Sequence, residues 1–477
     1  MKLIKYITCK KALSSNLLIP HLITVKFLVV CGLVFNTVSC DSFVDIDAPD
    51  NVLITETVFE DAATVKSALA NIYYKMREQG LISGTFGMSI AIGTYSDELD
   101  YYGFNSNSLK LYDHNLTASD GTVSNWWRHG YNLIYAANDI IKGIEESNLL
   151  QADQKNEFKG QALFIRAYLH SLLAGLFGDI PYITTTNYSE SGSVSRMPLS
   201  TVYEFIVSDL TQAVGLLENH TSGERVIPDQ STANALLARV YLYTENWLKA
   251  EETASALISA HTLEPDIDQV FLKNSMETLW QFKPKESGII NTQEGQALII
   301  TFLPTRGYAL TNNLLEAFEP GDLRRSHWVG EITSTDSSTT LYYAHKYKET
   351  INTSTSSLEH SIIFRLSEQY LIRAEARAHL GNISGALQDL NTIRQRAGLG
   401  NKTVTTLTDV LDAIIKERQV ELFTEHGQRW FDLKRTGRAS EILQPIKTNW
   451  SDNHVLLPIP DTDLLANPNL KPQNPGY

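Results

Sequence analysis

A cluster of carboxylates and arginines near the end of the chain has a spacing that could support acid–base chemistry. Glu417 and Glu421 are four residues apart, so on a helix both carboxylates would share one face. Paired carboxylates act as general acid and base in glycoside hydrolysis. Arg418, Arg429 and Asp432 accompany them. Because a nearby arginine lowers the pKa of a carboxylate and keeps it ionised, the pattern favours an ion-pair network between two helices over an active site.

Aromatic residues gather between residues 100 and 107 in a pattern typical of a binding loop. Three aromatics occur within four residues, with neither the alternation of a strand nor the stripe of a helix. Flat aromatic faces cover the C–H surface of a sugar ring, and planar polar groups at the rim take its hydroxyls. A second segment offers an arginine that could stack on or clamp a ligand. The predicted ligand-binding residues are Tyr101, Tyr102, Phe104, Asn105, Asn107, Arg306, Tyr308 and Trp328.

Tryptophans also have a structural interpretation. Trp328 follows Arg324 and Arg325, and the three side chains could instead pack their segment onto the scaffold. Trp126 and Trp127 lie in a helical pattern of aromatics, so we expect at least one of them in the core.

No catalytic or cofactor motif accompanies these residues. Beyond residue 39 the sequence has no HExxH, GxSxG, P-loop or GxGxxG after a strand, and no histidine pair at metal-ligand spacing on one helix. We therefore expect no catalytic residue, no cofactor and no metal site. A glycoside hydrolase stays open, because its two carboxylates can be distant in sequence, and so does a calcium ion that supports a loop.

The first 39 residues predict a secretory signal peptide. They contain five lysines and no acidic residue, and an apolar run of about 12 residues ends at Val38. A membrane-spanning helix needs roughly 20 residues. Cys40 follows as in a bacterial lipobox, so we expect lipidation of Cys40, with plain secretory cleavage as the alternative. Cys9 and Cys31 lie in the leader, so the mature chain would keep one cysteine and form no internal disulfide.

Charge excludes some ligands. Loss of the five leader lysines would change the net charge from −14 to −19. So acidic a chain repels nucleic acid and anionic lipid. The lipid on Cys40, and not a basic patch, would then attach the protein to a membrane.

Helical periodicity dominates the mature chain. Apolar residues recur every three or four positions over residues 59–76 and 202–217, which predicts two amphipathic helices, the first closed by Gly80. Thr201 and Glu204 have the spacing of a capping box at the start of the second helix. Residues 287–357, by contrast, show no sustained period, and 279–282 favour a short strand.

Two segments repeat the same offsets. In each, an asparagine comes eight residues after an alanine, and a second alanine comes four residues later. This spacing predicts two helix–turn–helix units that resemble tetratricopeptide repeats, with chance helical hairpins as the alternative. The residues are Ala238, Asn246 and Ala250 in one copy, and Ala374, Asn382 and Ala386 in the other.

Several segments, in order along nearly the whole mature chain, together resemble the SusD/RagB family. The segment 177–181, reading FGDIP after the RAYL of 166–169, is similar to a signature of that family. Further matching segments are 58–61, 68–73, 370–376, 390–394, 417–422, 429–435, 458–460, 467–468 and 473–477.

The resemblance implies a mainly all-α fold with a scaffold of tetratricopeptide-like helix pairs, long loops and at most a few short strands. It divides the chain into a signal peptide (1–39), a linker (40–56), an N-terminal part (57–225) and a C-terminal part (226–477) with a variable loop region (283–357), all but the first two in one compact fold.

The resemblance also implies a role. Members of the family are lipid-anchored at the outer membrane, face the cell exterior, and deliver a captured oligosaccharide to a SusC-like TonB-dependent transporter. A peptide in place of the oligosaccharide, a glycoside hydrolase, and a scaffold that binds only protein remain the alternatives. The density of aromatics in the loop favours sugar over peptide.

Overall fold

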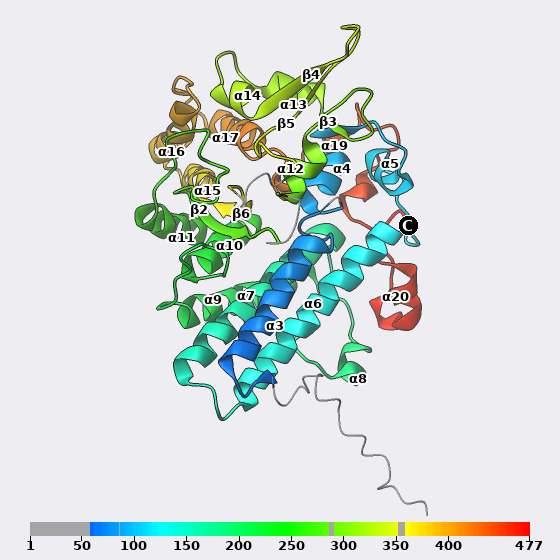
Figure 1. The fold of residues 1–477 in the computed structure, drawn as a ribbon, viewed down its shortest axis with the longest axis vertical. Helices are drawn as coiled ribbons and strands as arrows, with labels where there is room; N and C mark the ends of the chain where they lie inside the picture. The colour runs from blue at the N-terminus through cyan, green and yellow to red at the C-terminus, as the bar shows by residue number, and fades with distance from the viewer. Residues whose placement is uncertain (1–57, 85, 286–290, 352–357) are drawn as a thin grey trace, which may run out of the picture. The chain divides into compact units, whose positions relative to one another are not determined.

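The computed structural model describes residues 58–84, 86–285, 291–351 and 358–477. The leader, Cys40 and the linker 40–56 lie outside these residues. Within them the chain is mainly helical, and its strands have three to five residues (Figure 1). This confirms the mainly all-α fold class. None of the described helices has the length and apolar character that a membrane span requires.

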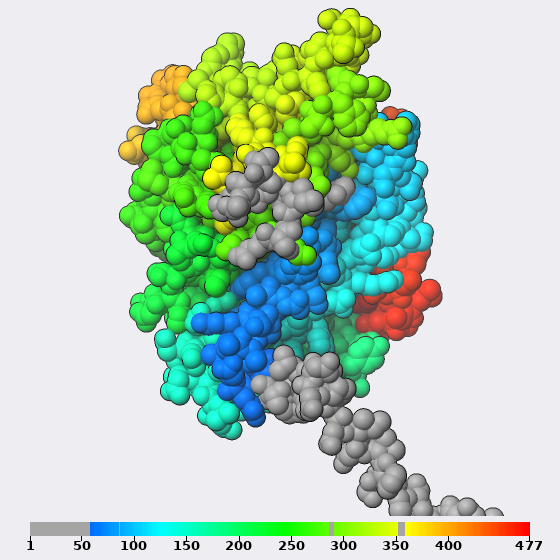
Figure 2. Space-filling view, in the orientation of Figure 1, coloured from blue at the N-terminus to red at the C-terminus, as the bar shows by residue number. Residues whose placement is uncertain are grey.

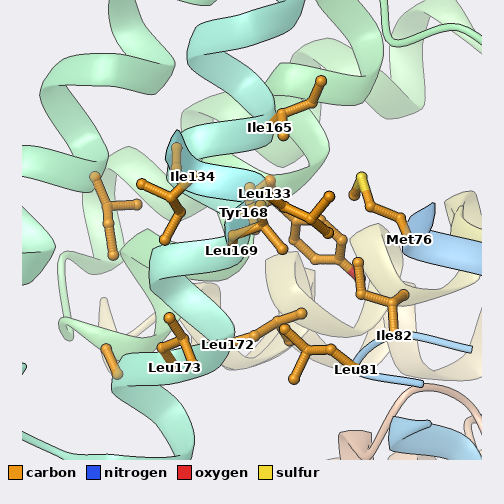
Figure 3. Close-up of a cluster of buried hydrophobic side chains, with 14 of the residues drawn as sticks. Met76, Leu81, Ile82, Leu133, Ile134, Ile165, Tyr168, Leu169, Leu172 and Leu173 are labelled. Carbon is orange, nitrogen blue, oxygen red and sulfur yellow. The ribbon is translucent and has the colours of Figure 1, made fainter. Parts of the chain in front are cut away.

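The N-terminal part is a layer of long helices around one that is almost wholly buried. Helix α7 packs between α6 and α9, and from Phe158 onward nearly all of its side chains are buried. Figure 3 shows Tyr168 and Leu169 of α7 against Met76 of α3 and Leu133 of α6. The layer comprises α3 (Ala62–Glu78), α6 (Gly121–Glu146), α7 (Ala152–Phe177) and α9 (Leu199–Leu216).

The periodic stripes form the expected helices, but the cap predicted for α9 does not form. Helix α9 begins at Leu199, directly after Pro198, so Thr201 lies inside its first turn and no capping box exists there. The Asp179 carboxylate accepts a hydrogen bond from the Leu199 amide at 2.9 Å instead. A residue distant in sequence has thus replaced the local cap. Asp179 follows Gly178, which ends α7 with a φ of +77°.

The two repeated segments are helix pairs, as their shared offsets predict. Each asparagine caps the second helix of its pair: Asn246 accepts from the Lys249 amide, and Asn382 from the Gly385 amide at 2.9 Å. The pairs pack on each other through α11 and α15, with small alanines at the crossing. They are α10 (Gln230–Tyr243) with α11 (Trp247–Ala260), and α15 (Leu366–His379) with α16 (Ile383–Arg396).

In the described part of the chain, three two-stranded antiparallel sheets lie among the helices. Strands β1 (Leu99–Tyr101) and β3 (Tyr308–Leu310) form one, and the predicted strand at 279–282 lies in the second. That second sheet joins β2 (Thr278–Phe282) to β6 (Ser361–Arg365), and the third joins β4 (Val329–Thr333) to β5 (Thr340–Ala344).

The described residues of the stretch 287–357, which are 291–351, contain more regular structure than the lack of period suggested. The elements described there are too short to show a helical period, since the longest of these helices has six residues. Besides β3, β4 and β5 it holds α12 (Gln293–Leu298), α13 (Asn312–Ala317) and α14 (Leu323–His327). The other elements are η2 (Met88–Ile92), α4 (Gly93–Tyr95), α5 (Ser106–Tyr112), α8 (Tyr188–Ser191), α17 (Leu407–Glu421), α18 (Gln428–Arg435), α19 (Ala439–Leu443), η3 (Asp452–Val455), α20 (Asp461–Ala466) and η4 (Pro468–Leu470).

Candidate functional site

The two segments predicted to bind ligand meet through the smallest sheet. Strand β1 pairs with β3 so that Tyr101 lies opposite Tyr308, and the Tyr102 amide then donates to the Gly307 carbonyl at 3.0 Å. Loops some 200 residues apart in sequence are thereby brought side by side. We call the two loops, residues 101–107 and 302–308, the paired loops.

Two tyrosines form the base of the paired loops. The rings of Tyr101 and Tyr308 lie 5.0 Å apart between centroids. Tyr308 is buried, and its hydroxyl lies 3.0 Å from that of Ser108. The Tyr101 hydroxyl accepts a hydrogen bond from the Asn105 amide at 3.0 Å. Both side chains therefore hold the loops together, and burial raises the pKa of Tyr308.

Exposed aromatics and an arginine form the outer surface of the paired loops. Phe104 is 79% exposed and Tyr102 is 44% exposed. The Arg306 guanidinium lies over the Phe104 ring, 5.5 Å from its centroid. Phe302, at 62% exposure, adds a third aromatic from the same loop as Arg306. It was absent from the predicted site because a single phenylalanine between Thr301 and Leu303 carries no sequence signal.

The two asparagines differ in what they can offer a ligand. The Asn105 side-chain oxygen caps α5, because it accepts from the amides of Asn107 and Ser108 at 3.0 and 3.2 Å. Asn105 is exposed, and its side-chain amide nitrogen has no hydrogen-bond partner among the described residues; the same holds for the side chain of Asn107. Asn105 thus both positions the loop and can donate to a ligand.

Gly103 lies where the backbone of one paired loop closely approaches the other loop. A Cβ atom at this position would lie 2.2 Å from the Tyr101 hydroxyl and 2.5 Å from the Arg306 carbonyl oxygen. Real Cβ atoms essentially never approach other atoms closer than 3.0 Å. Only glycine therefore permits this approach of the loops.

Trp328 does not belong to the site. Its side chain is 1% exposed, its indole N–H donates to the Ile267 carbonyl at 3.0 Å, and its ring meets Phe271 edge-on at 5.2 Å. The prediction that Trp328 binds ligand is wrong, since a ligand cannot reach a ring enclosed on all sides. Arg324 is also fully buried, which agrees with the alternative that these side chains pack their segment onto the scaffold.

The carboxylate and arginine cluster is the ion-pair network that its interleaving predicted. Arg324 contacts Glu417 at 2.7 Å and Glu421 at 2.9 Å. Glu421 also pairs with Arg365 at 2.6 Å. Arg418–Asp432 joins α17 to α18, and Arg394–Glu417, Arg435–Glu375 and Arg429–Asp97 tie these helices to the rest of the fold. Arg365, at the end of β6, also pairs with Glu277 and Glu425.

The pKa values of the two glutamates move in opposite directions. Three arginines outweigh burial at Glu421 and hold its pKa well below the usual range. Burial raises the pKa of Glu417 against the attraction of Arg324 and Arg394, contrary to the expectation that arginines would lower both. Both carboxylates are buried, with their oxygens turned to arginines, so neither reaches a substrate.

No metal site is found among the described residues, in which no three or more His, Cys, Asp or Glu side chains gather in a suitable arrangement. Of the predicted ligand-binding residues, those that remain open to a ligand lie in the paired loops.

Family models match both ends of the chain. The model described as "SusD family" matches residues 316–477, and the model described as "Starch-binding associating with outer membrane" matches residues 44–242. The chain belongs to the SusD/RagB family. Relatives align over nearly full length: SusD-like protein P2 of Formosa agariphila is 27% identical, covering 90% of this chain and 95% of that protein. SusD-like protein P25 of the same organism is 24% identical, covering 93% and 97%.

Solved structures share the fold of this SusD/RagB member. A SusD superfamily protein from Bacteroides vulgatus superimposes with a TM-score of 0.77 at 22% identity, covering 88% of this chain and all of that one. A laminarin-binding SusD-like protein gives a TM-score of 0.72 at 22% identity, covering 87% and 99%. These likenesses establish the architecture, and the site rests on this chain's own residues.

Proposed function

We propose that this protein captures oligosaccharides through the paired loops. The observation that carries the proposal is the exposed aromatic surface of Tyr102 and Phe104, held beside Arg306 by the β1–β3 pair. Single exposed aromatics are common on proteins, whereas a group of them with adjacent polar donors is typical of a binding surface.

The chemistry of these groups suits a neutral, hydroxyl-rich ligand. The aromatic faces can cover the C–H face of a sugar ring, while the Arg306 guanidinium and the Asn105 amide donate to hydroxyl oxygens. Burial and the Asp100 carboxylate raise the pKa of Tyr102, so its phenol stays protonated at neutral pH and can donate as well. Covering about 50 Å² of the Phe104 ring corresponds to about 1.3 kcal/mol, or roughly tenfold in affinity.

Binding without turnover is the form of the activity that we propose. The carboxylates with hydrolase-like spacing are buried in ion pairs, which supports a binding protein over a glycoside hydrolase. One of the two matched family models is described as starch-binding, and one structural neighbour as laminarin-binding. These descriptions support a glycan as the cargo here, with a peptide as the alternative.

We further propose that the protein is a lipoprotein, anchored through Cys40 at the outer membrane with the paired loops outside the cell. It would hand the glycan to a SusC-like TonB-dependent transporter. The description of the N-terminal family model as associating with the outer membrane supports this location. Co-purification from membranes of the native host with a large TonB-dependent protein would support the partnership, and recovery of the protein alone under conditions that preserve such complexes would contradict it.

A binding screen tests the proposed function. The protein, expressed from its full sequence and purified in detergent, would be presented with laminarin, soluble starch, other plant, host and microbial glycans, and a pool of peptides. Saturable binding of a glycan without release of shorter products is the expected result. Binding of peptides alone would move the cargo to the alternative class, and release of products would make the protein a hydrolase.

A further inference from the structure

A hollow lined by none of the paired-loop residues lies against α6. It has a volume of about 350 Å³ and is bounded by α6, by the segment that carries α8, and by α20 with η4. In Figures 1 and 2 both α8 (green) and α20 (red) lie beside α6. The hollow is large enough for one or two sugar rings, within the size class of small-molecule sites.

Aromatic rings form the floor and the walls of this hollow. Trp127 and Tyr131 are packed at its floor with their ring centroids 4.9 Å apart, and the Tyr131 hydroxyl donates to the Pro181 carbonyl at 2.9 Å. Tyr135 and Tyr188 line it from α6 and α8, and they are 48% and 84% exposed. The floor is thus fixed, while two tyrosine rings remain open to a ligand.

Polar groups at the rim of the hollow can form hydrogen bonds with the hydroxyl groups of a sugar. Arg128, Asn132 and Tyr135 are spaced by four and three residues on α6, so they share one face of the helix. The side chain of Asn132 and the hydroxyls of Tyr135 and Tyr188 make no hydrogen bond with any described residue. Unpartnered donors and acceptors beside open aromatic rings are the same combination that the paired loops present.

The charges and the backbone of the hollow favour a neutral sugar over a peptide. Arg128 faces Asp463 at 3.9 Å, so the two charges offset each other and the rim has no net charge. A peptide bound through its main chain would need free backbone groups in the wall. The carbonyl of Val194, which lines the hollow, already accepts a hydrogen bond from the side-chain amide of Asn467 at 2.8 Å.

We propose that this hollow is a second glycan-binding site, which takes a sugar unit through Tyr135, Tyr188 and Asn132. The proposal rests on the proposed function in one respect only, namely that the cargo is a glycan. With two sites, one chain could hold a long glycan at two points, or two glycans at once, and avidity would then raise the apparent affinity for polymers above that for short oligosaccharides.

The test uses short laminari- and malto-oligosaccharides, and the corresponding polymers laminarin and soluble starch, as probes. Hydroxyl-radical footprinting of the full chain measures protection at Tyr135 and Tyr188, and titration calorimetry gives the number of sites. Variants Y135A and Y188A each remove one exposed ring. Y74A is the matched control, because Tyr74 is 43% exposed on α3 and lines neither site. Thermal unfolding checks that all variants fold.

The proposal expects protection of Tyr135 and Tyr188 by a short oligosaccharide, and a loss of about tenfold in affinity at one of two sites in each variant. F104A should weaken the other site and leave this protection unchanged. One site per chain, with Y135A and Y188A binding as Y74A does, would overturn the second site and leave the proposed function standing. Failure of every glycan to bind the wild-type protein would overturn both.

Discussion

Replacement of Gly103 by alanine should separate the paired loops without unfolding the protein. The added Cβ would lie 2.5 Å from the Arg306 carbonyl oxygen and 2.2 Å from the Tyr101 hydroxyl, and both must retreat to 3.0 Å or more. The Tyr102 amide would then lose its 3.0 Å hydrogen bond to the Gly307 carbonyl. Overpacking of this kind costs about 1–3 kcal/mol.

The cost should appear in binding more than in stability. The β1–β3 pair is only three residues long, so it can open locally. We expect the melting temperature of G103A to fall by roughly 2–6 °C, and the affinity for a glycan ligand to fall at least about tenfold, because Phe104 and Arg306 no longer share one surface.

Calorimetric titration of G103A with the best glycan from the screen, beside a thermal scan, measures both quantities. Gly215→Ala is the matched control. Gly215 is exposed within α9, nothing lies within 4 Å of its added Cβ, and the change should stabilise the protein by about 0.5–1 kcal/mol with unchanged binding. Wild-type affinity in G103A would refute the view that the two loops act as one surface.

Three further predictions concern the scaffold. R365M should destabilise the protein by about 3–5 kcal/mol in urea unfolding, since it leaves Glu277, Glu421 and Glu425 without their shared partner. The control R438M removes an exposed ion pair and should lower the free energy of unfolding by less than about 1 kcal/mol. W328A should lower the free energy of unfolding by about 3–5 kcal/mol, because Trp328 is buried. F104A should change it by no more than about 0.5 kcal/mol. Equal losses in the two variants would contradict the burial of Trp328. Burial lowers the pKa of His170 to about 3, so between pH 6.5 and 3 the unfolded chain binds one proton more than the folded chain. Stability should therefore fall as the pH is lowered through this range, by about 1.4 kcal/mol per pH unit for this residue. H170Q should show a shallower slope in a denaturation series from pH 7 to 5, and an unchanged slope would show that His170 does not titrate there.

Local patterns predicted the scaffold well. The offsets of Asn246 and Asn382 predicted two helix pairs, because a capped turn between helices is decided by residues within one turn of each other. The capping box at Thr201 failed for the opposite reason, since Asp179 caps α9 from outside the local window.

The arrangement of the site depends on contacts between residues that are distant in sequence, and local patterns do not predict these contacts. The sequence placed Tyr101 and Tyr308 in two candidate loops, but only the β1–β3 register shows that they stack and form a base for Phe104. Trp328 looked like its exposed neighbours because an aromatic in an aperiodic segment carries no burial signal. The hollow on α6 was missed since Tyr188 joins it from a distant segment. Lipidation at Cys40 and the division of the fold at residues 225–226 stay predictions.

The most direct test of the central claim is calorimetric titration of the wild-type protein and of the double variant Y102A/F104A with the same oligosaccharide. Both side chains are exposed, so the variant should keep its melting temperature. Two lost ring faces predict a loss of roughly 100-fold in affinity at the paired loops if the effects add. Identical titrations for the two proteins would contradict the claim that the paired loops bind the cargo.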